Sequence, residues 1–183
     1  MYRYQPKSKE DSLTASFEHD FAQYMGVKHA VGTNSCGSAM FIALNIVGVQ
    51  PGDTVLTNAF TFHAVPSVIE HARAVPVLVE SNREWAMDPK DLDKKATETG
   101  AKVLLMSYMR GHVPDMDAIM KVVEKHGLIL IEDCAHAYAT LWNNKLLGTF
   151  GEIGCFSTQS SKALSAGEGG IFITDNDEHA ARA

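Results

Sequence analysis

The stretch that decides the fold runs from Lys102 to Thr140 and reads KVLLMSYMRGHVPDMDAIMKVVEKHGLILIEDCAHAYAT. Its two uninterrupted apolar runs, 102–107 and 128–132, have the length and composition of buried strands. The segment between them predicts a helix over 115–126. Its apolar residues recur every three or four positions, it opens on a capping aspartate, and Gly127 follows it. The stretch therefore predicts a strand, a helix and a second strand.

The same alternation continues along the chain. Four further apolar runs predict strands, at 54–57, 74–80, 153–157 and 170–174. Four further segments have helical spacing, at about 13–25, 38–48, 64–72 and 88–98. Strands that are apolar throughout and alternate with helices predict an α/β fold in three layers, α/β/α, with a mostly parallel sheet covered on both faces. Ligands of such folds bind beyond the carboxyl ends of the strands.

Length and charge narrow the class of protein. A chain of 183 residues is enough for one domain with a real core. Its formal net charge of -6 gives a nucleic-acid partner no electrostatic support. No apolar run is long enough to span a bilayer, and the first residues lack the apolar core of a signal peptide. We expect a cytoplasmic protein with neither a nucleic-acid nor a membrane partner.

The cysteines and histidines do not form a metal-binding pattern. Cys36, Cys134 and Cys155 are far apart and form no CxxC pair, so we expect reduced thiols. The eight histidines are scattered, without an HExxH or comparable spacing. We therefore expect no metal site.

The candidate site residues lie at predicted strand ends and at one helix start. Cys36 and Gly37 open a helix among small residues, where free amides and the helix dipole suit a phosphate; an ordinary capped helix is the alternative. Asp133 follows a buried strand and could hold a protonated ring nitrogen or a ribose hydroxyl, or simply cap the next turn. His136 could contact a ligand or be a loop histidine, and Phe62 could stack on a flat ligand or belong to the core.

A single lysine stands in CFSTQSSKALSAGEGG, residues 155–170. Lys162 has small and hydroxylated neighbours and no charged residue after it until Glu168. A lysine removed from water has a lowered pKa and becomes a nucleophile, as in lysines that form Schiff bases; an ordinary lysine on a flexible surface loop is the alternative. Lys162, Asp133, an aromatic residue and a helix start together match the aldehyde, ring nitrogen, ring and phosphate of pyridoxal phosphate (PLP).

Longer motifs carry a resemblance to a known family. In chain order they are FEHDFAQYMGVKHAVGTNSCGSAMFIAL, GVQPGDTVLTNAFTFHAV, RGHVPDMDAIM, LILIEDCAHAYAT, GTFGEIGCFSTQSSK and GEGGIFIT. From about Phe17 onward the chain resembles the DegT/StrS-type aminotransferases, PLP enzymes that aminate nucleotide-linked keto-sugars. The resemblance implies the large PLP-binding domain of a fold type I transferase over residues 1–183. The family's C-terminal small domain would be absent, so the chain would be truncated.

The resemblance also implies roles for individual residues. Lys162 falls on the lysine that forms the Schiff base, and Asp133 on the acid that pairs with the pyridinium nitrogen. Phe62 falls on the aromatic residue that stacks on the ring, and His136 on a contact to the cofactor's hydroxyl side. The phosphate would be held by three residues, which are Ser157, Cys36 and Gly37. Cys36 and Gly37 replace the family's usual Gly-Thr.

The implied activity is transfer of an amino group from an amino acid, glutamate or glutamine, to a keto-sugar, with Lys162 as the general acid and base. Lysine at position 162 favours aminotransfer over the family's dehydratases, which carry histidine there. The implied assembly is a homodimer with the site at the interface.

Two other functions compete with this interpretation of the sequence. The first is a truncated, non-catalytic PLP-binding domain. The second is a nucleotide-binding module without PLP. That module predicts a GxGxxG turn after the first strand, and the sequence has none.

Overall fold

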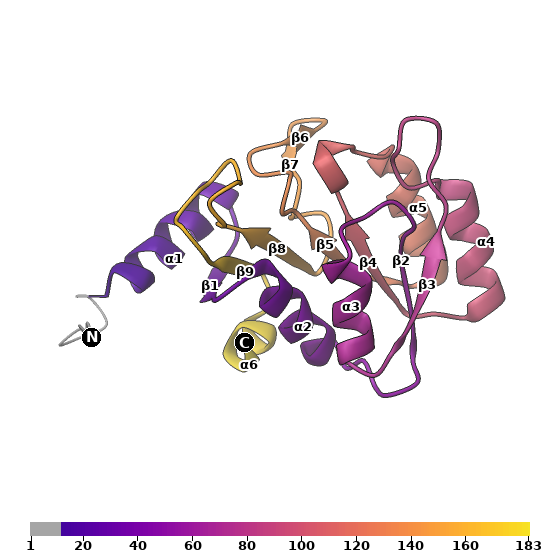
Figure 1. Cartoon of the computed structure of the whole chain (residues 1–183), viewed down its shortest axis with the longest axis horizontal. Coiled ribbons are helices and arrows are strands. Elements are labelled where there is room, and N and C mark those ends of the chain that lie inside the picture. Colours follow the sequence, from indigo (N-terminus) through magenta and orange to yellow (C-terminus); the bar gives the residue numbers. More distant parts are fainter. Residues whose placement is uncertain (1–11) are drawn as a thin grey trace.

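A computed structural model describes residues 12–183 and shows seven strands in one sheet with helices on both faces (Figure 1). The sheet strands are β1 (His29–Thr33), β2 (Thr54–Asn58), β3 (Val75–Val79), β4 (Val103–Ser107), β5 (Ile129–Asp133), β8 (Ile153–Ser157) and β9 (Gly170–Thr174). The helices are α1 (Leu13–Met25), α2 (Cys36–Ile46), α3 (Ala64–His71), α4 (Pro89–Thr99), α5 (Met116–His126), α6 (Asp177–Arg182) and a 3₁₀ turn, η1 (Met109–Gly111). A hairpin of β6 (Leu141–Trp142) and β7 (Lys145–Leu146) stands apart from the sheet.

The strand order β1-β9-β8-β5-β4-β2-β3 confirms the predicted mostly parallel sheet. The pairs from β8 to β3 are all parallel, whereas β9 runs antiparallel to both of its neighbours. Parallel strands share one carboxyl edge, so the loops that follow β2, β4, β5 and β8 emerge on the same side of the sheet.

Two hydrophobic clusters confirm the three layers. One joins the sheet to α1, α4 and α5, and the other joins it to α2 and α3. Strand β5 shows how one segment serves both clusters, because successive side chains point to opposite faces. Leu130 belongs to the first cluster and Ile131 to the second. By the same alternation Glu132 faces the α4/α5 side and Asp133 the α2/α3 side.

The helix over 115–126 forms as predicted. Asp115 Oδ1 accepts from the Ala118 amide at 3.0 Å, and Gly127 ends the helix in the left-handed conformation. Helix α2 begins at Cys36, two residues before the predicted start, because Ser35 Oγ caps it by accepting from the Ser38 amide.

The sequence patterns missed two elements of the three-layer fold, β1 and α6. Every residue of β1 is only partly buried, so the strand lacks a continuous apolar run. Helix α6 has six residues and no buried side chain. The described helices include none that is both long and apolar enough to cross a membrane.

Candidate active site

The carboxyl ends of the strands and the start of α2 surround a cavity of about 740 Å³. All seven residues singled out in the sequence line it; they are Cys36, Gly37, Phe62, Asp133, His136, Ser157 and Lys162. The cavity lies on the α2/α3 side of the sheet, and residues of the loop between β8 and β9 also line it. This loop is drawn in gold in Figure 1. Its volume is within the range of small-molecule and cofactor sites.

Asp133 ends β5 and is buried. Its Oδ2 accepts from Ser107 Oγ at 2.7 Å, and its Oδ1 accepts from the Ala135 amide at 3.0 Å. Cys36 Sγ lies 3.6 Å from Oδ1 as a further, weak donor. Burial, and next the charge of Asp133, raise the pKa of the Cys36 thiol well above its ordinary value, so Cys36 stays a protonated donor.

Lys162 lies at the wall of the cavity and is partly exposed, so it is less buried than the lysine envisaged from the sequence. Its Nζ is 2.7 Å from His136 Nε2. Burial, followed by the charge of Lys162, lowers the pKa of His136, so the imidazole is neutral at pH 7. The lysine therefore donates, Nε2 accepts, and the imidazole proton is on Nδ1.

The start of α2 offers backbone donors to the cavity. The Ser38 amide donates to Ser35 Oγ and the Ala39 amide to Ser35 O. Among residues 12–183, the amides of Cys36 and Gly37 have no acceptor, as is usual in a first helical turn. Both amides are therefore available to an anion.

Glycines set how closely α2 approaches the sheet. A Cβ on Gly170 would lie 2.3 to 2.5 Å from backbone atoms of Ser35 and Cys36, so only glycine lets β9 begin directly against the start of α2. A Cβ on Gly37 would meet nothing closer than Ser35 Oγ at 3.7 Å. Position 37 therefore has room for a Cβ, and close packing does not require glycine there.

Phe62 and Ser157 lie on the cavity wall from two other strands. Phe62 follows β2 in the loop before α3 and is 51% exposed, which overturns its alternative reading as a core residue. Ser157 ends β8, and its Oγ accepts from the Gln159 amide at 3.3 Å.

Ser107 and Arg110 are among the residues of this region that were not singled out in the sequence. Ser107 ends β4 and holds Asp133, so a search of every strand end would have found it. Arg110 lines the cavity from η1 in a left-handed conformation, with φ of 53°. It occurs in the quoted RGHVPDMDAIM motif, but no spacing in the sequence gave it a role.

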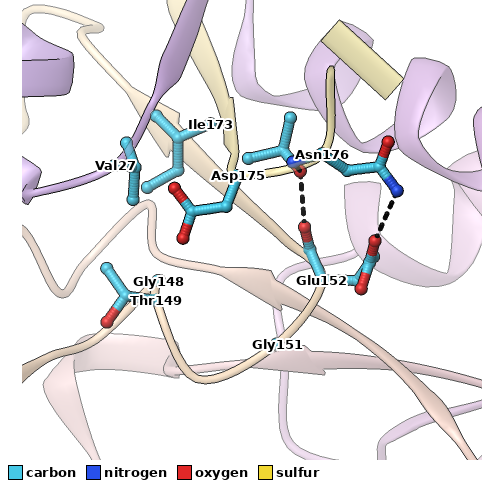
Figure 2. A pocket seen from close by; sticks show the side chains of 9 residues that line it. Val27, Gly148, Thr149, Gly151, Glu152, Ile173, Asp175 and Asn176 are labelled. Atoms are coloured by element: carbon cyan, nitrogen blue, oxygen red, sulfur yellow. Dashed lines mark hydrogen bonds between the residues drawn. The ribbon is translucent and has the colours of Figure 1, made fainter. Parts of the chain in front are cut away.

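A second cavity, of about 200 Å³, lies around the C-terminal end of β9 and the loop before β8 (Figure 2). Its polar groups bond to one another: Asn176 Nδ2 donates to Glu152 Oε1 at 3.1 Å, and Thr174 Oγ1 donates to Glu152 O at 2.9 Å. The Lys28 amide donates a hydrogen bond to Asp175 Oδ1 at 2.8 Å. These contacts build a corner of the fold, and none of the seven candidate residues lies there.

The donor set of the larger cavity fits PLP. It combines an amine for an aldehyde, a buried carboxylate for a protonated ring nitrogen, an exposed aromatic ring for stacking, and two backbone amides with a hydroxyl for a phosphate. This combination of groups is the one expected of a PLP site, and a class of enzymes that use PLP is therefore the first candidate. A more particular assignment comes from comparison with known proteins.

The chain belongs to the DegT/DnrJ/EryC1/StrS aminotransferase family, whose model matches residues 8–183. It is similar to the spore coat polysaccharide biosynthesis protein SpsC of Bacillus subtilis, with 39% identity over 88% of this chain and 42% of that protein. It is also similar to the L-glutamine:2-deoxy-scyllo-inosose aminotransferase of Streptoalloteichus tenebrarius, with 38% identity over 94% of this chain and 41% of that protein.

Among solved structures, the chain is similar to DesV of S. venezuelae in complex with a ketimine intermediate. The TM-score is 0.86 at 34% identity, over 92% of this chain and 46% of that chain. These relatives include an aminotransferase whose name gives L-glutamine and 2-deoxy-scyllo-inosose as its substrates. The chain spans less than half the length of each of these three proteins.

Proposed function

We propose that this chain is the PLP-binding large domain of a sugar aminotransferase that moves an amino group from glutamine or glutamate to a keto-sugar carried on a nucleotide. The observation that carries the proposal is that one cavity gathers the amine of Lys162, the carboxylate of Asp133 and the free amides at the start of α2. The S. tenebrarius relative, named for an L-glutamine donor and a keto-cyclitol acceptor, supports this donor and the amination of a ring ketone.

Seven residues of the chain would hold the cofactor. Lys162 would be its covalent anchor, and the Asp133 carboxylate would pair with the protonated ring nitrogen. The amides of Cys36 and Gly37, with the Ser157 hydroxyl, would bind the phosphate. Phe62 would stack on the ring and His136 would contact its hydroxyl side. When bound, PLP supplies an electron sink for the pair left by removal of a Cα proton.

Lys162 and His136 carry the proton chemistry. Their nitrogens are 2.7 Å apart, so His136 lies where it can hold the lysine amine whenever that amine is not bonded to the cofactor. Once freed from the cofactor, the Lys162 amine would take the donor's Cα proton as general base and then give it, as general acid, to the cofactor carbon that is bonded to the amino nitrogen. The neutral His136 would accept a hydrogen bond from that amine and keep it directed into the cavity.

Asp133 would keep the ring nitrogen protonated through a carboxylate that is already fixed by its neighbours. The Ser107 and Ala135 bonds leave its orientation little freedom. A fixed charge needs no reorganisation when the electrons of the Cα bond move toward the ring.

The setting of the protein belongs to the same proposal. We place it in the cytoplasm, where nucleotide-linked sugars and amino acids meet, and as a homodimer with the site at the interface. Sedimentation of the purified chain measures the dimer directly.

A half-reaction tests the proposed activity. The chain would be loaded with PLP and mixed with L-glutamine or L-glutamate, and pyridoxamine phosphate and the keto acid would be counted by chromatography. We expect one of each per Lys162 site, and transfer of that amine to an added nucleotide-linked keto-sugar. PLP fixed on Lys162 with no pyridoxamine phosphate formed would favour a non-catalytic PLP-binding domain instead. The matched control is Lys162→Ala.

A further inference from the structure

Three neighbouring parallel strands end in polar side chains that are all buried. Asn58 ends β2, Ser107 ends β4 and Asp133 ends β5, with exposed fractions of 3%, 3% and 4%. Buried polar groups are costly unless they are paired, so three of them in a row need a physical reason.

Asn58 continues the sheet where its backbone pairing stops. The β2–β4 register ends at Thr57 and Leu105. Beyond it, Asn58 Nδ2 donates to Ser107 O at 3.0 Å and Asn58 Oδ1 accepts from the Ser107 amide at 2.8 Å. The side-chain amide thus pairs with Ser107 as a peptide group of a neighbouring strand would. It binds both the carbonyl and the amide of Ser107 and so fixes the backbone of that residue.

Ser107, held in this way, in turn fixes the orientation of Asp133. It is opposite Asp133 in the β4–β5 register, and its Oγ donates to Asp133 Oδ2 at 2.7 Å. A carboxylate only accepts, so the hydroxyl proton points at Asp133 and the bond is charge-assisted. The Ala135 amide holds the other oxygen at 3.0 Å.

We propose that Asn58 and Ser107 are positioning residues that aim the Asp133 carboxylate at the ring nitrogen of the bound cofactor. This inference rests on the proposed function, since it assigns the purpose of the network to the acid of that site. It assigns no contact with the cofactor to either residue. Their effect is exerted through the orientation of one carboxylate, which a buried network holds more rigidly than a loop could.

Two cofactors separate positioning from general stability. The probes are PLP and its deaza analogue, in which a carbon replaces the ring nitrogen. The wild-type chain should bind PLP more tightly than the analogue, because only PLP can pair with Asp133. In Ser107→Ala the ratio of the two dissociation constants should fall about tenfold, the change expected when one charge-assisted hydrogen bond is misaligned. Ser107→Thr keeps the hydroxyl and should restore the ratio.

Thr57→Val is the matched control. Thr57 neighbours Asn58, is fully buried, and its Oγ1 has no hydrogen-bond partner among the described residues. Removing that hydroxyl should leave the ratio unchanged. Asn58→Ala should lower the ratio in the same direction as Ser107→Ala, and thermal unfolding of each apo variant shows that it is folded.

The outcomes separate the two proposals. If the wild-type chain does not distinguish PLP from its deaza analogue, Asp133 does not pair with the ring nitrogen and the proposed function fails at that residue. If the wild type distinguishes them and Ser107→Ala keeps the full ratio, the positioning role is wrong while the proposed function stands. A loss of affinity for both cofactors by the same factor would also overturn it, because that is the effect of a purely structural residue.

Discussion

Glu132 and Asp133 are adjacent acids that face opposite sides of one sheet, and their surroundings differ in kind. Glu132 is fully buried on the α4/α5 side and accepts from Tyr108 Oη at 2.5 Å, the Gly148 amide at 2.8 Å and the Gly151 amide at 2.7 Å. Asp133 is buried on the α2/α3 side, but it also lines the large cavity. The Glu132 carboxylate makes its hydrogen bonds within the fold, whereas the Asp133 carboxylate can also bind a ligand in the cavity.

The difference between the two acids comes from what packs over each face. On the Glu132 side a glycine-containing loop closes directly on the sheet: a Cβ on Gly151 would lie 2.3 Å from Leu130 O. On the Asp133 side the start of α2 approaches over Gly170 and leaves the cavity beside it. Strand alternation therefore separates a structural acid from a candidate catalytic acid within two residues.

The largest expected effect is on activity. Asp133→Asn removes the charge that would hold a protonated ring nitrogen, so we expect the covalent cofactor adduct to form but transamination to fall by about 10² to 10⁴. Glu132→Gln, the matched control on the opposite face, should keep activity per folded molecule within a few-fold. Transamination rates of the two variants, normalised to bound PLP, make the comparison. Equal losses of transamination rate in Asp133→Asn and Glu132→Gln would contradict the proposal that only the acid on the α2/α3 side takes part in catalysis.

A second effect concerns stability. Tyr108→Phe takes one donor from the buried Glu132, so we expect the free energy of unfolding to fall by about 1–3 kcal/mol, measured by urea denaturation. Tyr138→Phe is the control, because the Tyr138 ring is only partly buried and its hydroxyl interacts with the half-exposed Tyr24, so its removal leaves no buried acid without a donor. An unchanged midpoint for Tyr108→Phe would mean that the Glu132 network contributes nothing to folding.

The pH dependence of unfolding should identify Glu132. Burial raises the pKa of Glu132 above its ordinary value of 4.5, and the bonds from Tyr108, Gly151 and Gly148 only partly oppose this. A raised pKa means that the folded state binds the proton more tightly, so the Glu132 contribution is full below about pH 4.5 and is lost as pH rises through the folded pKa. The free energy of unfolding of wild type minus Glu132→Gln should therefore decrease with rising pH. A flat or increasing difference would contradict the cause given for the shift.

The smallest expected effect is on the cavity histidine. The pKa of His136 is lowered first by burial and then by the positive charge of Lys162. Lys162→Ala removes that charge, so the pKa of His136 should rise toward its ordinary value of 6.5 and stay below it, because the burial remains. NMR titration of the histidine ring protons measures it. A fall in the pKa would mean that the lysine does not act on the imidazole as a cation.

Much of the fold could be predicted from the sequence because its central strands and helices carry strong local patterns. The apolar run 128–132 and the capped helix over 115–126 are examples, and both appear in the structure. Strand β1 could not be predicted in this way, because all five of its residues are partly buried and its identity as a strand depends on pairing with β9. Its partner residues are more than 130 positions away in the chain.

The site residues also fall into two groups, those that local sequence patterns predict and those that depend on contacts between distant segments. Lys162, Asp133 and the start of α2 could be found because each lies at the end of a recognisable element. Ser107 and Asn58 were missed, since their roles depend on register: the Asn58–Ser107 bonds join residues 49 positions apart, and the Ser107–Asp133 bond joins residues 26 apart. Composition and spacing within one segment carry no record of such pairs.

The most direct test of the account is borohydride reduction of the purified chain with added PLP, followed by peptide mass mapping. We predict one phosphopyridoxyl group per chain, on the peptide that contains Lys162. The group should be absent from Lys162→Ala and retained in Asp133→Asn and Glu132→Gln. A folded wild-type chain without this adduct, or an adduct that persists in Lys162→Ala, would contradict the central claim that the cavity on the Asp133 side of the sheet holds the cofactor through Lys162.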